Sequence, residues 1–376
     1  MARVLVFCDA YLPGYRAGGP VPSISRIIET DPSHEFRVVT RDREVDDSQS
    51  FPGMVPQTWL EVGNAHAAYL RPGVRDFQWL STEVKAWQPD FYYLNSLHSP
   101  LYSSTPLLEM RLHRFPPAPL VLAPRGETSP GALALKRRKK QLAKPLIKRL
   151  VGESVTWHVS SNLEEVEVRN WWGGEMPNGH SFLVRPDLAV PPADQASSGG
   201  SPDEIPVVPF ASRIDRMKGL DEAITLMASV PDPYRFEMRG VVRDAKYWES
   251  CRQAAAAELG DANYTFNGQY TPPEAQEIFA RSVLLLLPTR GENFGHVIAE
   301  ALSVGCPVLI SNKTPWTPVV EDGGGAILHD RESARRFIHE VLTESAEARG
   351  HRRELALASY RRWFSANQDS SSLFGA

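Results

Sequence analysis

Residues 283–311, VLLLLPTRGENFGHVIAEALSVGCPVLIS, decide the fold of this chain. The stretch opens with the continuous apolar run 283–287, closed by Pro288, which is typical of a parallel strand buried on both faces. A loop with two glycines follows, and then apolar residues recur at helical spacing until Gly305 ends the helix. The loop therefore delivers backbone amides to the start of a helix, where unpaired N–H groups and the helix dipole favour an anion.

Two carboxylates give this stretch its chemical character. Glu292 lies in the loop, and Glu300 follows it in the helix with seven residues between them. Helical side chains lean back toward the N-terminus, so the carboxylate of Glu300 should point at the loop. Carboxylates accept hydrogen bonds from paired hydroxyls such as those of a sugar or a ribose. A solvated loop glutamate beside a helix-edge glutamate is the alternative that the spacing alone leaves open.

In the context GENFGHVIAEALSVGCPV, the two glutamates resemble the Glu-x7-Glu signature of the retaining glycosyltransferase family 4, whose fold is GT-B. The resemblance implies an α/β chain of two Rossmann-like, doubly wound lobes that face each other across a cleft. It implies that Glu292 holds the donor sugar and that Glu300 takes the ribose. The other donor-binding residues that it implies are Gly291 in the loop, Asn293, Phe294 and Gly295 at the sugar, and His296 and Val297 near the diphosphate.

Length and composition indicate how many domains the chain can form and which kinds of partner it can have. With 376 residues the chain is long enough for two domains. Its 45 acidic and 41 basic residues create no general field that would recruit nucleic acid. The three cysteines lie far apart and indicate reduced core residues of a cytoplasmic protein. We therefore expect a cytoplasmic location, no nucleic-acid partner, no signal peptide and no transmembrane segment.

The first lobe is predicted from alternating strands and helices that begin with the strand at 4–8, and ligands of such sheets bind beyond the carboxyl ends of the strands. The loop after this strand lacks G-x-G-x-x-G, which argues against a nicotinamide cofactor. It contains Gly18 and Gly19, whose backbone can approach a ligand closely. The family resemblance implies that these glycines face the donor phosphates, and a plain flexible connection is the alternative.

A second resemblance lies in residues 124–140, PRGETSPGALALKRRKK, which are similar to a segment of family 4 enzymes of bacterial surface-polysaccharide synthesis. Many family members have a histidine near this place that contacts the donor sugar, but Arg125 stands here instead. His98, at the end of another predicted strand, is the candidate substitute, although a structural histidine is the commoner case at a strand end. We therefore expect Arg125, Glu127 and His98 on the acceptor or sugar side of the site.

A basic segment, KRRKKQLAKPLIKR, begins at Lys136 and ends at Arg149. One interpretation is an amphipathic helix that contacts anionic lipid at the inner face of the membrane, as would suit a lipid-linked acceptor. The alternative is a solvated helix face, which we favour modestly because Pro145 interrupts the apolar stripe.

The domain boundaries follow from composition. Residues 188–206 are rich in proline, glycine and serine and predict a linker between an acceptor-side lobe, 1–187, and a nucleotide-sugar lobe, 207–354. The GT-B resemblance implies that a helix at about 355–376 packs back onto the first lobe.

Two cations in the second lobe are expected to bind the diphosphate. Arg213 and Lys218 follow its first predicted strand, five residues apart, where two cations can clamp an anion. They are similar to the family's diphosphate-gripping pair. The resemblance also implies that the backbone around Gln269 and Tyr270 meets the base.

The function that these residues predict is retaining transfer of a sugar from a nucleotide-diphosphate sugar to a hydroxyl of a carbohydrate or lipid-linked acceptor, in polysaccharide or glycolipid biosynthesis. Glu292, Arg213 and Lys218 are the expected catalytic residues, and the resemblance implies that the departing phosphate oxygen accepts the acceptor's proton. Because the chain has no Asp-x-Asp, we expect neither a bridging metal nor a cofactor beyond the donor. The alternatives are a GT-B nucleotide-sugar epimerase or hydrolase, and a non-enzymatic nucleotide-binding regulator.

Overall fold

The structure, a computed structural model, describes all residues of the chain except 46, 135–136, 202–203, 368–371 and 376. The chain forms two compact units. The first unit contains Met1–Leu188 together with the C-terminal tail, of which residues 372–375 are described, and the second unit starts at Ala189. No helix among the described residues has the length and apolar character needed to cross a bilayer.

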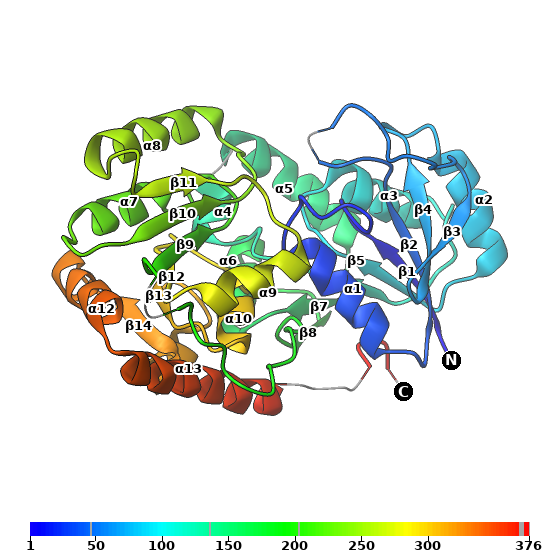
Figure 1. Cartoon of the computed structure of the whole chain (residues 1–376). Coiled ribbons are helices and arrows are strands. Elements are labelled where there is room, and N and C mark those ends of the chain that lie inside the picture. The colour runs from blue at the N-terminus through cyan, green and yellow to red at the C-terminus, as the bar shows by residue number, and fades with distance from the viewer. Residues whose placement is uncertain (46, 135–136, 202–203, 368–371, 376) are drawn as a thin grey trace. The chain divides into compact units, whose positions relative to one another are not determined.

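The first unit is built on an eight-stranded sheet in the order β3-β4-β2-β1-β5-β6-β7-β8 (Figure 1). Neighbouring strands pair in parallel, apart from the antiparallel pair β3 and β4. The strand bounds are β1 (Arg3–Phe7), β2 (Glu35–Arg41), β3 (Trp59–Val62), β4 (Ala65–Leu70), β5 (Phe91–Leu94), β6 (Leu120–Leu122), β7 (Ser154–Val159) and β8 (Gly179–Val184).

Both faces of this sheet are buried. Leu5 and Phe7 of β1 enter one hydrophobic cluster, and Val4 and Val6 enter another, as the alternation of side chains along a strand requires. The second cluster is covered by α1, and the first by α2, α3, α5 and α6. The helix bounds are α1 (Pro20–Thr30), α2 (Phe77–Trp87), the π-helix η1 (Pro100–Ser104), α3 (Thr105–Arg111), α4 (Pro130–Ala134), α5 (Arg137–Val151) and α6 (Asn162–Trp172).

The second unit contains two three-stranded parallel sheets, β11-β10-β9 and β12-β13-β14. They meet at β9 and β12, where Val283 N–H donates to the carbonyl of Val207 at 3.0 Å. The strands are β9 (Val207–Ala211), β10 (Arg235–Arg239), β11 (Tyr264–Phe266), β12 (Leu285–Leu287), β13 (Val308–Ser311) and β14 (Gly325–Leu328). The helices are α7 (Leu220–Ala228), α8 (Ala245–Glu258), α9 (Pro272–Arg281), α10 (His296–Ser303), α11 (Thr317–Val319), the π-helix η2 (Val320–Gly324), α12 (Arg331–Thr343) and α13 (Ala346–Asn367).

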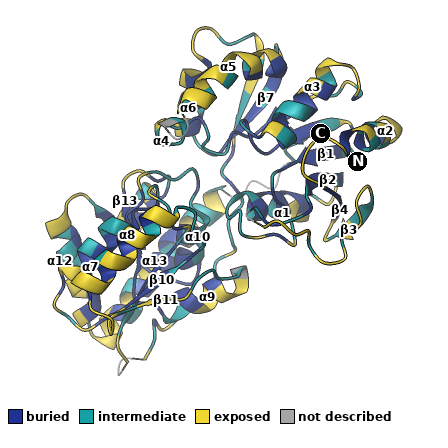
Figure 2. Cartoon of the chain, turned by 90° about the horizontal axis from the view of Figure 1, so that it is seen from above, coloured by how far each residue is buried: buried dark blue, intermediate teal, exposed yellow. Residues whose placement is uncertain are grey.

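Figure 2 shows the same layering in each unit, with buried strands between helices that expose their outer faces. Because parallel strands connected by helices bury both faces, such sheets need a hydrophobic run at each strand. The apolar run at 283–287 meets this need, and Leu285, Leu286 and Leu287 are fully buried in β12.

The expected linker and C-terminal helix differ from the structure. Residues after Ala189 belong to the second unit, and Ala193 N–H donates to the carbonyl of Ser303 at 2.8 Å. Helix α13 also belongs to the second unit, where buried Arg353 donates to the carbonyl of Ser282 at 2.5 Å. The expectation that this helix packs on the first lobe is therefore wrong, because the hydrogen bonds of Arg353 fix it to the second unit. Only the tail beyond it lies in the first unit.

Candidate functional site

The loop between β12 and α10 has the geometry that its two glycines predict. Gly295 caps α10 with a φ of +85°, a left-handed conformation that favours glycine. A Cβ at this position would lie 3.1 Å from Cδ1 of Ile298 and 3.5 Å from Cγ of Glu292. The chain therefore enters α10 tightly, and the backbone amides of the first turn remain beside the Glu292 loop.

A second turn, between β9 and α7, lies directly against this loop. Gly219 has a φ of +74°, and a Cβ there would lie only 2.3 Å from the carbonyl oxygen of Pro288. The carbonyl of Met217 accepts hydrogen bonds from Thr289 Oγ1 at 3.0 Å and from Arg290 N–H at 2.7 Å. These contacts fix the two turns to each other at the carboxyl ends of β9 and β12.

The contact between the turns joins two of the predicted catalytic residues. Lys218 Nζ donates to Glu292 Oε1 at 2.5 Å, and the two side chains are only 11% and 8% exposed. A buried ion pair of this kind holds both groups in one orientation, because breaking it would leave a charge without compensation in a poorly solvated place. The structure thus unites residues that lie 74 positions apart in the sequence.

Arg213 belongs to the same turn but is placed differently. Its side chain is 44% exposed, and Nε lies 3.9 Å from Asp215 Oδ2. Lys218 is instead buried against Glu292. The two cations that were expected to clamp an anion therefore differ, because the ammonium of Lys218 is held in a buried ion pair and the side chain of Arg213 is exposed.

The residues predicted for the ribose and the base lie close together. Burial raises the pKa of the Tyr270 phenol above its ordinary value, and the neighbouring carboxylate of Glu300 adds to the rise, while Arg239 opposes it. The phenol is thus a neutral hydrogen-bond donor near Glu300 at neutral pH. Gln269 precedes Tyr270 in the loop between β11 and α9, so this loop and the middle of α10 meet.

Phe294 does not have the expected sugar-facing side chain. It is buried in the core of the second unit, with its ring 5.3 Å from that of Trp316 and 4.8 Å from that of His296. Trp316 Nε1 also donates to its carbonyl at 2.5 Å. Phe294 therefore stabilises the loop from the core side, whereas the loop residues around it, 291–293 and 295–297, are partly exposed. Trp316 comes 22 positions later, so nothing in the loop sequence indicated it.

In the first unit, Glu127 anchors the turn that follows β5. Its carboxylate accepts from the backbone amides of Leu97 at 2.6 Å and His98 at 2.8 Å, and from Ser96 Oγ at 3.0 Å. His98 Nδ1 lies 3.5 Å from the same carboxylate. Burial alone would raise the pKa of Glu127, but His98 and the two amides lower it below its ordinary value. Glu127 is therefore an ionised positioning residue for the turn that carries His98.

The structure contradicts the expectation that Arg125 faces a sugar or an acceptor. Its guanidinium is buried and donates to Asn95 Oδ1 at 2.6 Å, to Tyr93 Oη at 2.7 Å and to Asp187. Burial alone would lower the pKa of Arg125, but the Asp187 carboxylate raises it above its ordinary value. Arg125 is a structural cation because Asp187, 62 residues away, supplies its counter-charge inside the unit.

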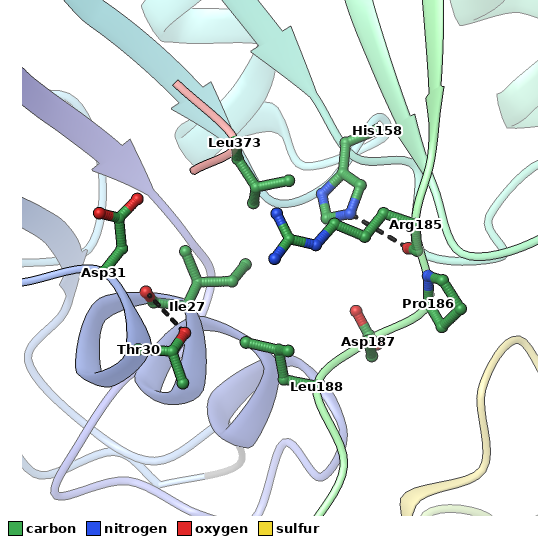
Figure 3. A pocket seen from close by; sticks show the side chains of 9 residues that line it. All are labelled: Ile27, Thr30, Asp31, His158, Arg185, Pro186, Asp187, Leu188 and Leu373. Carbon is green, nitrogen blue, oxygen red and sulfur yellow. Dashed lines mark hydrogen bonds between the residues drawn. The ribbon is translucent and has the colours of Figure 1, made fainter. Parts of the chain in front are cut away.

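The Arg125 network continues to a small pocket in the first unit. Tyr93 Oη lies 2.8 Å from His158 Nδ1, and burial, with Arg125 nearby, lowers the pKa of His158 to about 3. His158 lines the pocket together with residues of α1, of the segment after β8 and of the C-terminal tail (Figure 3). None of the residues predicted from the sequence for the site lines this pocket.

The loop after β1, just before its two glycines, is fixed by a residue that the sequence did not single out. Glu44 is buried and accepts from the backbone amides of Tyr15 at 2.8 Å and Arg16 at 3.2 Å. Gly18 has a φ of +74° and open space where a Cβ would lie, so it forms a turn, while Gly19 begins α1. Within the described residues, no cluster of three or more histidine, cysteine, aspartate or glutamate side chains could hold a metal.

Comparison with known proteins agrees with this architecture. Residues 193–357 match the family of glycosyl transferases group 1. The D-inositol 3-phosphate glycosyltransferase of Nocardioides sp. is 31% identical over 152 residues, which are 36% of this chain and 33% of that protein. The chain thus spans about a third of the length of this curated relative.

Solved structures are similar over nearly the whole chain. Sucrose-phosphate synthase from Thermosynechococcus elongatus has a TM-score of 0.72 and 17% identity, and the match covers 98% of this chain and 95% of that chain. Alr3699/HepE from Anabaena, in complex with UDP and glucose, has a TM-score of 0.66 and 14% identity, with 98% and 96% covered. These likenesses and the two parallel-sheet units confirm the expected GT-B fold. The family match is thus confined to residues 193–357, whereas the likeness in fold extends over nearly the whole chain.

Proposed function

We propose that this protein is a retaining glycosyltransferase that moves a sugar from a nucleotide-diphosphate sugar to a hydroxyl acceptor. The observation that carries the proposal is the buried Lys218–Glu292 ion pair at the start of α10. It places an ammonium, a carboxylate and the amides of a helix start in one small region. A leaving diphosphate and a sugar with developing positive charge need these three kinds of group.

In the proposed mechanism, each group of the second unit has one task. Lys218, Arg213 and the amides of 295–297 stabilise the negative charge that grows on the leaving diphosphate. Glu292 accepts hydrogen bonds from the donor sugar while Lys218 keeps it in place. The bond from the anomeric carbon to the diphosphate breaks, the acceptor oxygen bonds to the same face, and the departing phosphate oxygen takes the acceptor's proton. We further propose a hexosyl donor and no requirement for a divalent metal.

The decisive experiment is incubation of the protein with labelled UDP-, GDP- and ADP-sugars, with and without a panel of glycoside acceptors, in buffer that contains EDTA. UDP-glucose comes first in the panel because HepE, a similar structure, was solved with UDP and glucose. The proposal expects nucleoside diphosphate release that depends on an acceptor, together with a product of retained anomeric configuration. Release or epimerisation without an acceptor would favour an epimerase or hydrolase, and binding without any turnover would favour a nucleotide-binding regulator.

The acceptor-side proposal concerns α5 and its contact with a membrane. Lys136, the first residue of the basic segment, lies outside the described residues. From Arg137 onward the helix continues through Pro145, and Leu142, 80% exposed, lies one turn from exposed Leu146. Exposed Arg138 and Lys139 lie in the preceding turn. We propose that this surface binds anionic lipid at the inner face of the membrane, where a cytoplasmic enzyme would meet a lipid-linked acceptor.

Vesicle sedimentation tests this contact. A Leu142→Ser/Leu146→Ser double variant should lose binding to vesicles that contain phosphatidylglycerol, because the apolar contribution to insertion is lost. Wild-type protein should not bind vesicles of phosphatidylcholine alone. A Leu355→Ser variant, which changes an exposed leucine of the second unit, is the matched control. Undiminished sedimentation of the double variant would leave α5 as a solvated helix face.

A further inference from the structure

The carboxyl edge of the first sheet contains a carboxylate that the proposed chemistry has not used. Asp9 lies two residues beyond β1, and β1 lies next to β5, which in turn pairs with β6. The turn 95–99 follows β5, and Glu127 follows β6. Parallel strands end at the same edge of a sheet, and ligands of such folds bind there. Asp9 therefore shares its edge with Glu127 and His98.

Asp9 is fixed on one side and accessible on the other. Its Oδ1 accepts from Arg41 Nη2 at 3.0 Å, yet its side chain remains 40% exposed. Burial of the carboxyl raises its pKa above the ordinary value, Glu127 adds to the rise, and Ser99 and Arg41 oppose it. These influences place Asp9 close to the turn that carries His98. An anchored carboxylate that keeps exposed acceptor capacity is suited to a hydroxyl group.

The imidazole of His98 lies beside the carboxylate of Glu127, at a distance that is long for a hydrogen bond. His98 is only 10% exposed, and neither of its ring nitrogens has a hydrogen-bond partner among the residues that the structure describes. Its Nδ1 points to within 3.5 Å of Glu127 Oε2, and its ring edge packs on Trp171. Buried polar nitrogens are normally satisfied by protein, water or ligand. A group from outside the chain, either a ligand hydroxyl or a water that it orders, is therefore expected at this edge.

The charges at the edge select the kind of ligand. Two carboxylates, Asp9 and Glu127, stand here against the one cation that pairs with Asp9, Arg41, so the three side chains together carry a net negative charge. A phosphate or carboxylate ligand would be repelled, whereas O–H groups can donate to Asp9. The chemistry thus favours a neutral sugar or another polyol.

We infer that Asp9 binds the acceptor in the first unit by accepting a hydrogen bond from a hydroxyl of a neutral sugar, and that Glu127 and His98 are positioning residues of the same subsite. The inference rests on the proposed function, because a transferase needs a second substrate that presents a hydroxyl. It adds Asp9 and a preference for uncharged acceptors to that function.

Saturation-transfer NMR with millimolar methyl glucoside, methyl galactoside and methyl mannoside tests the subsite directly. Wild-type protein should give signals with at least one glycoside and none with glucose 6-phosphate. Asp9→Asn should weaken the signals about tenfold, because a hydroxyl donates a stronger hydrogen bond to a charged acceptor than to a neutral one. Asp9→Glu should restore part of the binding. Glu292→Ala should retain the signals, which separates this subsite from the donor-sugar position.

Asp90→Asn is the matched control for Asp9→Asn. Asp90 is 42% exposed and also pairs with an arginine, Arg3, but it precedes β5 and so lies at the opposite edge of the same sheet. Wild-type signals in Asp9→Asn, absence of glycoside signals in the wild type, or stronger binding of glucose 6-phosphate would each overturn the inference. Calorimetry with UDP tests the proposed function separately. Absent UDP binding would contradict the donor site, whereas unchanged UDP affinity in Asp9→Asn alongside lost glycoside signals supports the acceptor role.

Discussion

The two units carry basic residues at the same structural position, beyond the carboxyl ends of parallel strands, but use them differently. In the first unit Arg125 is buried and its hydrogen bonds go to Tyr93, Asn95 and Asp187. In the second unit Lys218 reaches Glu292, and Arg213 remains exposed. Arg125 and Lys218 are both buried in ion pairs, and they differ in the place of the partner: Glu292 lies in the loop at the start of α10, whereas Asp187 lies inside the first unit. The difference can be tested by removing the charges one at a time.

The largest effect is expected for Arg125→Met. Removing the guanidinium leaves Asp187 as an uncompensated buried charge, which typically costs about 3–5 kcal/mol. Hydrogen exchange at the amides of β5 and β6 should accelerate accordingly. Arg213→Met should leave exchange in the second unit unchanged and should only weaken UDP binding. Equal stability of Arg125→Met and wild type would contradict the structural role of this residue.

The next largest effect is expected for Lys218→Ala. Loss of one charge aimed at the transition state typically lowers kcat by about 10²–10³. The measurement is initial velocity with the donor and acceptor pair found by incubation. Lys246→Ala, which removes an exposed lysine of α8, should retain the wild-type rate. If Lys218→Ala turned over at the same rate as Lys246→Ala, the ammonium would have no part in the chemistry.

Glu300→Ala should have a smaller effect that is confined to binding. A carboxylate that accepts hydrogen bonds from ribose hydroxyls contributes about 1.5–3 kcal/mol, so calorimetry should report UDP affinity at least about tenfold lower. Glu258→Ala, at the exposed end of α8, is the control. Unchanged affinity in Glu300→Ala would remove the residue from the ribose site.

The effect expected to be smallest near neutral pH is a pH dependence that belongs to the first unit. The pKa of His158 falls from 6.5 to about 3 on folding. As the pH is lowered, this histidine is therefore protonated in the unfolded chain before it is protonated in the folded protein. The contribution of neutral His158 to the free energy of unfolding is fully present above pH 6.5. It declines by about 1.4 kcal/mol per pH unit as the pH falls toward 3. His158→Gln should flatten this decline in urea unfolding, whereas His66→Gln, which changes a partly exposed histidine, should not. A decline of equal slope in His158→Gln would assign the effect to other groups.

The sequence predicted local structure better than contacts across the chain. The strand, loop and helix around Glu292 follow from the apolar run and two glycines, which act over a few residues. The family resemblance assigned Lys218 and Glu292 to one site. It did not predict their direct contact, which depends on how Gly219 packs against Pro288. Phe294 and Arg125 were misassigned because their partners, Trp316 and Asp187, lie far along the chain.

Helix α5 contains a proline that local preferences alone would disfavour. Proline lacks an N–H and clashes with the preceding turn of a helix. The helix nevertheless runs from Arg137 to Val151, and buried Ile147, Leu150 and Val151 pack its last turns against the first unit. Tertiary packing here outweighs a local penalty of about 3 kcal/mol.

The C-terminal tail has a consequence for the order of events during synthesis. Phe374 is 1% exposed, and its ring lies 5.7 Å from that of Phe36 and 5.9 Å from that of Tyr93. A ribosome adds this residue after the whole second unit has been translated. Domains generally fold as units while the chain emerges. The hydrophobic core of the first unit would thus lack Phe374 until translation ends. The second unit, whose residues are all translated earlier, would be able to complete its core first.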